Sequence, residues 1–356
     1  MFGVLLLLGV SSSLRFVISV LIGGAVMPSS RLTRTVVDAL CEYVPTLVSG
    51  LGLENIKSQF ALRDASLESS AALLRDKCNG HQVQIRTALG HTVQATVCLP
   101  RGRELQRPAL AGVVVHFGGN GQIAQLMPPA AVLRYTRLGF GLVLPNYRGV
   151  AGSTGFTTRR AAVLDAICIA VGSSVQLGVP LSQVVLEGHS IGGGFAAEAA
   201  LALPHVHACL DRTFASLPDA AVATVVPWAC RGVHVNSWLG WLARRAVAAA
   251  VRHGGDWGLS PLHAIVQLAK MRKLKGFGGS RMIMVESVSN DQYVKRSVFV
   301  LPGMHFSCCP QDYPRACAAG RPAAIQPPTG VHRHAKAWLH AGAGQPGWGS
   351  AQPRVH

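Results

Sequence analysis

The sequence is poor in acidic residues and in charge as a whole. Only 16 of its 356 residues are Asp or Glu, against 33 Lys or Arg, and charged residues make up 14% of the chain while hydrophobic residues make up 49%. So little charge argues against a disordered chain or a coiled coil. A chain of this length and apolarity can bury one large core, and we expect one large α/β domain built around a sheet.

The sequence also lacks a recognisable nucleic-acid-binding pattern, although its formal net charge is +17. The basic residues are scattered as single arginines or as pairs such as Arg159-Arg160 and Arg244-Arg245, with no aromatic residues interleaved in a basic stripe. We therefore expect no nucleic acid as a partner. Attraction to acidic lipid head groups accounts better for the charge.

None of the nine cysteines forms a C-x-x-C pair or has a convincing zinc-ligand spacing, so no metal is expected. Several of them, such as Cys98 and Cys168, lie in apolar runs, where cysteine behaves as a small buried hydrophobe. The odd count leans towards reduced thiols in a reducing compartment.

The first 27 residues are almost wholly apolar and favour membrane association or secretory targeting. A transmembrane helix has the required length, but Arg15 near its middle would cost about 2.5–3.5 kcal/mol. In a signal peptide, Arg15 would precede the apolar run 16–21, with Gly23 and Ala25 at a cleavage site. A buried or interfacial helix is the third reading. The compartment itself stays unknown from the sequence.

The periodicity of the chain divides it into four parts. Residues 1–27 form the targeting or anchor segment, residues 28–80 have helical spacing and form an N-terminal extension, and residues 320–356, rich in Pro, Gly, Ala and His, form a loose tail. Between them, residues 81–319 form the main domain, with a helical insertion at 225–275.

Within the main domain, alternating residues at 83–87 and 93–99 predict an antiparallel hairpin. Short apolar runs then alternate with helical segments, which is typical of a mostly parallel sheet flanked by helices on both faces. The predicted strands span residues 112–117, 141–145, 183–187, 208–210, 282–286 and 298–301, and the predicted crossover helices span residues 157–175 and 192–203.

The sharpest chemical signal is GHSIG at residues 188–192, which follows a predicted strand and opens a predicted helix. A nucleophile on such a tight turn takes a strained conformation, and Gly188 and Gly192 avoid clashes beside it. The helix N-terminus adds partial positive charge where an oxyanion would form. The pattern therefore predicts Ser190 as a nucleophile, against the alternative of an ordinary glycine turn.

The second signal is HFGGNG at residues 116–121, directly after an apolar strand. Its glycines let the backbone approach the nucleophile and present N–H groups to a developing oxyanion. We assign one oxyanion-hole donor to Asn120 or Gly119 and the other to Ile191. A phosphate-binding loop is the alternative, but the spacing fits neither of the common phosphate-loop patterns.

The third segment, NYRGVAGSTG at residues 146–155, follows the next strand. The three segments, in this order and spacing, resemble those of α/β-hydrolases whose oxyanion loop reads H-G-N and whose next loop reads D-Y-R-G-x-G-x-S-x-G. The resemblance extends from about His81 to His305 and includes the segment DRTFASL at 211–217. It implies an α/β-hydrolase fold, with Arg148 and Asp211 as supporting residues that hold the loops.

In that fold the nucleophile is followed along the chain by an acid and then by a histidine. The resemblance places His305, just beyond an apolar strand, as the base, with His332 and His334 as rivals. Asp291 fits the position of the acid, but only 14 positions separate it from His305, where the fold usually holds a helix and a strand. Glu286 and Asp211 are therefore alternatives for the residue that orients the histidine.

The insertion at 225–275 carries four tryptophans, Trp228, Trp238, Trp241 and Trp257, and a helix-like run at 237–252. Such a segment can form a cap that overhangs the nucleophile and shapes an apolar pocket, which would suit acyl or lipid substrates. A plain surface helix is the alternative.

Together these features predict a serine hydrolase that cleaves a carboxylic ester or thioester bond. Its expected substrates are small molecules or acyl lipids, and no cofactor is expected. The alternative from another class is a noncatalytic scaffold or binding protein with the same fold. A possible membrane association would depend on residues 1–27.

Overall fold

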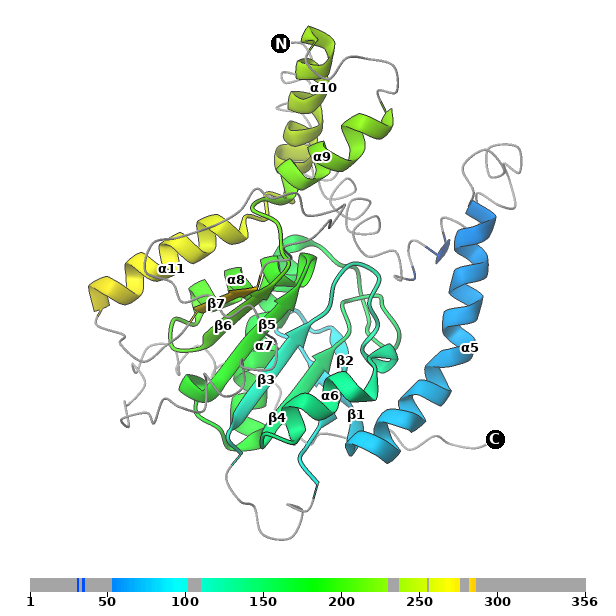
Figure 1. The fold of residues 1–356 in the computed structure, drawn as a ribbon, viewed down its shortest axis with the longest axis vertical. Coiled ribbons are helices and arrows are strands. Elements are labelled where there is room, and N and C mark those ends of the chain that lie inside the picture. The colour runs from blue at the N-terminus through cyan, green and yellow to red at the C-terminus, as the bar shows by residue number, and fades with distance from the viewer. Residues whose placement is uncertain are drawn as a thin grey trace.

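A central sheet organises the molecule in the computed structural model, which describes residues 31, 34–35, 53–101, 110–229, 237–254, 256–275 and 282–285 (Figure 1). Within these residues the sheet has seven strands in the order β1-β2-β4-β3-β5-β6-β7. Their bounds are Gly80–Arg86 (β1), Thr92–Cys98 (β2), Gly112–Phe117 (β3), Phe140–Pro145 (β4), Val184–His189 (β5), His207–Asp211 (β6) and Met282–Val285 (β7).

The sheet is mixed. β2 pairs antiparallel with β1 and with β4, whereas the β3–β4, β3–β5, β5–β6 and β6–β7 pairs are parallel. The predicted hairpin is confirmed: Gly90, at φ 76°, turns the chain, and the N–H of Thr87 donates to the oxygen of His91. β3 and β4 are buried along their whole length, which explains why they appear in the sequence as continuous apolar runs.

Helices cover both faces of the sheet, as predicted. The helices of the described residues are α5 (Leu53–Cys78), α6 (Pro129–Thr136), α7 (Arg159–Leu177), α8 (Ile191–Ala202), α9 (Leu217–Ala229), α10 (Trp238–Ala249) and α11 (Pro261–Lys275), of which α9 and α10 extend away from the sheet (Figure 1). Short 3-10 turns lie at Ala124–Leu126 and Leu181–Gln183, and a π-helical turn at Ala250–Gly254 continues α10.

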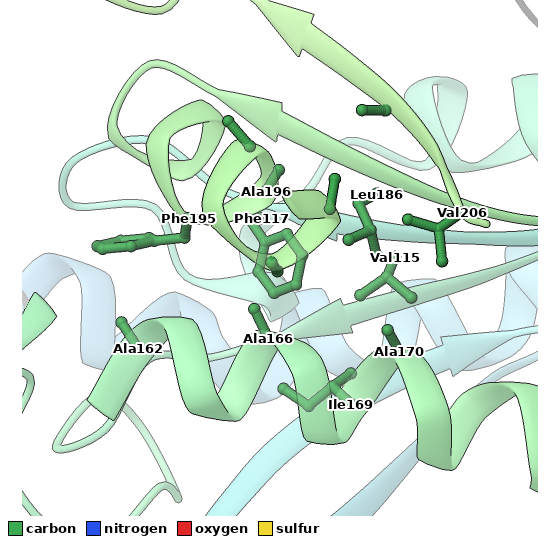
Figure 2. Close-up of a cluster of buried hydrophobic side chains, with 14 of the residues drawn as sticks. Val115, Phe117, Ala162, Ala166, Ile169, Ala170, Leu186, Phe195, Ala196 and Val206 are labelled. Atoms are coloured by element: carbon green, nitrogen blue, oxygen red, sulfur yellow. The ribbon is translucent and has the colours of Figure 1, made fainter. Parts of the chain in front are cut away.

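The core has one layer on each face of the sheet. On one face, α7 presents small side chains, Ala162, Ala166 and Ala170, to the strands, which lets the helix approach closely (Figure 2). On the other face, Leu74 of α5 and Val132 of α6 lie in a cluster with strand residues such as Val114 and Leu142. The alternation along β3, with Val113 and Val115 in the first layer and Val114 in the second, follows from the strand period of two.

Among the described residues, α7 alone is long and apolar enough to cross a membrane by length and composition. Its buried face lies in the core with Ala166 and Ile169, so this helix is part of the domain. The predicted segment 1–27, the strand at 298–301 and the tail at 320–356 lie outside the described residues.

Candidate active site

Ser190 occupies the turn between β5 and α8 and has φ 53° and ψ −118°, a backbone conformation that is rare for a residue with a side chain. Its N–H donates to the main-chain oxygen of Asp211 at 3.0 Å, and its own oxygen accepts from the Thr213 hydroxyl at 2.6 Å. These contacts hold the turn from both sides. The side chain is half-buried, and its hydroxyl makes no hydrogen bond with the described residues.

The two glycines of the turn are required by close backbone approach. A Cβ added to Gly188 would lie 2.3 Å from the oxygen of Gly192, and one added to Gly192 would lie 2.1 Å from the oxygen of Phe117. Real contacts are never this short. The second distance also shows that the N-terminus of α8 packs directly on the chain that leaves β3.

The loop after β3 lies beside Ser190. A Cβ on Gly119 would be 3.3 Å from the Cβ of Ser190 and 2.8 Å from the imidazole Cδ2 of His189. The N–H of Gly119 donates to the side-chain oxygen of Gln122. Asn120 is exposed, and it makes no hydrogen bond with the described residues. Ile191 opens α8, where backbone N–H groups have no partner inside the helix.

The loop after β4 holds the loop after β3 in place. The Tyr147 hydroxyl donates to the oxygen of Gly118 at 2.7 Å, and its ring packs edge-on to Phe195 of α8 with centroids 5.4 Å apart. Burial raises the pKa of Tyr147, so the hydroxyl remains a donor. The side-chain oxygen of Asn146 accepts from the N–H of Ala124 at 2.8 Å. The three sequence segments thus meet at one edge of the sheet.

Arg148 is buried and forms a two-pronged ion pair with Asp165 of α7, with both N–O distances at 2.6 Å. Its guanidinium also donates to the Thr87 hydroxyl at 3.2 Å, and its main-chain oxygen accepts from Thr157. The side chain therefore ties the loop after β4 to α7 and to the β1–β2 turn.

Asp211 ends β6 next to Ser190. Its Oδ2 lies 2.9 Å from Nδ1 of His189 and 2.8 Å from a guanidinium nitrogen of Arg212, whose Nε donates to Oδ1. Burial alone would raise the pKa of this carboxyl, but the hydrogen bonds from His189 and Arg212 lower it to about 2. Both carboxylate oxygens thus have partners among the described residues.

Two features near the site were not predicted from the sequence. One is the Thr213 hydroxyl that binds the oxygen of Ser190. The other is a buried cluster in which Glu187 of β5 accepts from the Tyr135 hydroxyl at 2.8 Å and lies 3.0 Å from His116 of β3. His116 and Glu187 are polar residues in otherwise apolar strands, and this pattern indicates such a cluster because buried polar groups need partners.

The predicted base is His305 and the predicted acid is Asp291. His305 and Asp291, with the alternatives His332, His334 and Glu286, lie outside the described residues. Within the part of the chain that the structure describes, no group of three His, Cys, Asp or Glu side chains could hold a metal ion.

The tryptophans of the predicted cap do not lie as one group. Trp257 is fully buried in the core with its ring edge-on to Phe195. Trp238 and Trp241 of α10 are exposed by 72% and 55%. The helix-like run at 237–252 is confirmed as α10 and the π turn that follows it.

The strand order, the antiparallel β2, and the strand–turn–helix around Ser190 define an α/β-hydrolase fold. No protein-family model matches the chain. Solved structures to which the chain is similar include an esterase from Pyrococcus furiosus, at 11% identity over 60% of this chain and 70% of that one, with a TM-score of 0.41.

An alpha-beta hydrolase from Vibrio vulnificus is 16% identical over 61% of this chain and 76% of that one, with a TM-score of 0.40. An esterase from Pyrobaculum calidifontis is 17% identical over 64% of this chain and 74% of that one, with a TM-score of 0.38.

Proposed function

We propose that this chain is a serine hydrolase that cleaves carboxylic esters or thioesters through an acyl-enzyme on Ser190. The observation that carries the proposal is the backbone of Ser190, at φ 53° on the turn between β5 and α8. Strained backbone conformations of this kind cluster at functional sites in proteins. Here the turn presents a hydroxyl, unbonded to any described residue, beside the loop after β3.

The helix behind Ser190 supports the same chemistry. α8 begins at Ile191, so under this proposal its partial positive charge and the Ile191 N–H would stabilise the negative charge that develops on a carbonyl oxygen under attack. Asn120 or Gly119 would supply the second donor. Because the Gly119 N–H donates to Gln122, its use requires that side chain to move, whereas Asn120 needs no such change.

The proposed reaction has two halves. Ser190 Oγ attacks the carbonyl carbon while His305 takes its proton, and Asp291 holds the imidazole in the productive tautomer. The tetrahedral intermediate then releases the alcohol or thiol with that proton. Water, activated by the same histidine, attacks the acyl-enzyme and frees the acid. Acyl lipids and acylated proteins are the substrate classes that we propose, since aromatic side chains near a cleft suit acyl or lipid groups.

Hydrolysis of p-nitrophenyl esters of graded acyl length tests the proposal. We expect turnover by the full chain, and a loss of at least about a thousandfold in kcat in Ser190→Ala. Ser182→Ala, an exposed serine before β5, is the matched control and should keep full activity. A folded chain without turnover at any acyl length would favour the noncatalytic scaffold, and equal activity of Ser190→Ala would exclude the proposed nucleophile.

The same assay identifies the base and the acid. Among His305→Ala, His332→Ala and His334→Ala, only the first should lose activity to the level of Ser190→Ala. Among Asp291→Asn, Glu286→Gln and Asp211→Asn, we expect the largest loss in kcat from Asp291→Asn. A larger loss from either of the others would reassign the acid and leave Ser190 as the nucleophile.

A further inference from the structure

Large apolar side chains are exposed together at one place, the start of α10. Of the nine large hydrophobic residues that are exposed in the described part of the chain, four lie within residues 238–242: Trp238, Leu239, Trp241 and Leu242. Single exposed apolar residues are ordinary on soluble proteins, whereas a contiguous group marks an interaction surface.

Three of these side chains lie on one face of the helix together with an arginine. Trp238, Trp241, Leu242 and Arg245 have the spacing i, i+3, i+4 and i+7, which aligns them along one side. The Arg245 guanidinium lies 4.7 Å from the centre of the Trp241 ring. Gly240, on the opposite side of the helix, is buried. The aromatic face therefore points away from the protein.

Within α10 and the π turn that follows it, the charge has one sign. Residues 237–254 contain the exposed arginines Arg244, Arg245 and Arg252 and no Asp or Glu. Tryptophan prefers the head-group level of a bilayer, where its ring is half in hydrocarbon and its N–H is hydrated, and arginine pairs with lipid phosphate. Aromatic and basic residues thus meet on one helix face, which is the pattern of a helix that lies on a membrane.

We propose that this α10 face (Trp238, Trp241, Leu242 and Arg245) docks on the surface of an anionic lipid bilayer. The indoles insert at head-group depth, and Arg244, Arg245 and Arg252 contact anionic head groups. Charge complementarity selects this occupant, since a segment with three arginines and no carboxylate, residues 237–254, suits a surface of continuous negative charge. The helix pair α9–α10 also extends away from the sheet, which leaves the face accessible to a flat surface (Figure 1).

The docked helix would lie on the same side of the molecule as the turn at Ser190. β6 ends at Asp211, whose oxygen accepts from the Ser190 N–H, and α9 begins only six residues later at Leu217. Docking through α10 does not require residues 1–27 or catalysis, so it can be tested without an activity assay.

Quenching of tryptophan fluorescence by brominated lipid tests the docking directly on the full chain. Vesicles of phosphatidylcholine with phosphatidylserine, with and without brominated acyl chains, are compared with phosphatidylcholine alone. We expect quenching on the anionic vesicles that is lost in W238F/W241F, which keeps aromatic rings at both positions but removes the two emitting indoles. Quenching that is unchanged in W238F/W241F would place other tryptophans at the membrane and overturn the proposal.

Two further variants separate the apolar and the charged parts of the contact. Binding of R244Q/R245Q to anionic vesicles should weaken about tenfold, with no change on neutral vesicles. W238S/W241S should lose quenching and bind less well, while L89S, an exposed leucine on the β1–β2 turn, should behave as the unchanged chain. Equal quenching on neutral and anionic vesicles would contradict the charge argument. A dimer that forms without lipid and dissociates in W238S/W241S would assign the face to a second copy of the chain.

Discussion

At the scale of single residues, the candidate site depends on how the backbone of Ser190 is held. The carbonyl of Asp211 and the hydroxyl of Thr213 bind this residue from β6 and the loop that follows it, and Gly188 and Gly192 remove the side chains that would push the turn open. Strain at one residue persists only when its surroundings fix it in this way. The hydroxyl is thus presented by contacts that come from neighbouring strands.

Two glycines in helices should respond oppositely to replacement by alanine. In Gly192→Ala the new Cβ would overlap the oxygen of Phe117, so we expect a loss of about 3 kcal/mol or more in the free energy of unfolding. In Gly172→Ala, within α7, nothing lies within 4 Å of the new Cβ, and the better helix propensity should stabilise by about 0.5–1 kcal/mol. Urea unfolding measures both values. A neutral Gly192→Ala would mean that β3 and α8 are not in contact as described.

Asp211 should make the free energy of unfolding depend on pH in a narrow acidic range. Its folded pKa of about 2 lies below the ordinary value of 3.8, so its contribution is complete above the ordinary value and is lost as the pH falls through the folded one. The difference corresponds to about 2 kcal/mol. We expect Asp211→Asn to be less stable than the unchanged chain by about this amount near pH 5, and nearly equal to it near pH 2. A constant gap in urea unfolding between these pH values would contradict the assignment.

At the scale of elements, polar contacts decide how the loops at the candidate site join the helices. Arg148 links the loop after β4 to α7 through Asp165, and Tyr147 links it to the loop after β3. The Arg148–Asp165 contact is buried and the Tyr147 contact is part-buried, so removing one partner of the first has the larger effect.

The Arg148–Asp165 pair should be far more sensitive than a surface pair of the same charges. Asp165→Asn leaves a buried guanidinium without its carboxylate, and we expect a loss of about 3–5 kcal/mol in the free energy of unfolding. The matched change, Asp256→Asn, removes an exposed partner of Arg159 at 3.6 Å and should cost at most about 0.5 kcal/mol. Thermal unfolding compares the two. Equal effects would show that the buried pair adds nothing beyond a surface contact.

Sequence patterns identified elements better than they identified contacts between elements. The predicted strands at 112–117, 141–145 and 183–187 lie within two residues of β3, β4 and β5, because fully buried strands appear as apolar runs with turn residues at their ends. α6 has only eight residues, which give little more than two turns of helical periodicity, so the sequence pattern does not predict it. The predicted helices do not include α11 either, although Pro261 at its start is typical of a helix N-terminus.

Contacts between residues far apart in the chain could not be predicted from the local sequence pattern. Asp165 is an ordinary polar residue in the sequence of α7, and its contact with Arg148 arises only when the helix packs back on the sheet. The link between Thr213 and Ser190 likewise depends on β6 lying beside β5. Apolar runs mark strands, but they do not determine which strands are neighbours.

At the scale of the whole molecule, the sheet gathers three loops around one serine at its carboxyl edge, and α9 and α10 extend from the same side (Figure 1). In parallel sheets ligands bind outside the carboxyl ends of the strands, because the loops that follow the strands meet there. The architecture therefore brings the Ser190 hydroxyl and an aromatic, basic helix face to the same side of the sheet. A hydrolase that works beside a lipid surface would use both.

Covalent labelling with a fluorophosphonate probe tests the central claim most directly, because the probe reacts only with a serine whose hydroxyl is activated as a nucleophile. The account predicts one labelled peptide carrying the probe on Ser190, complete loss of labelling in Ser190→Ala, and unchanged labelling in Ser182→Ala. A folded chain that takes up no probe, or that carries it on another serine, would contradict the account.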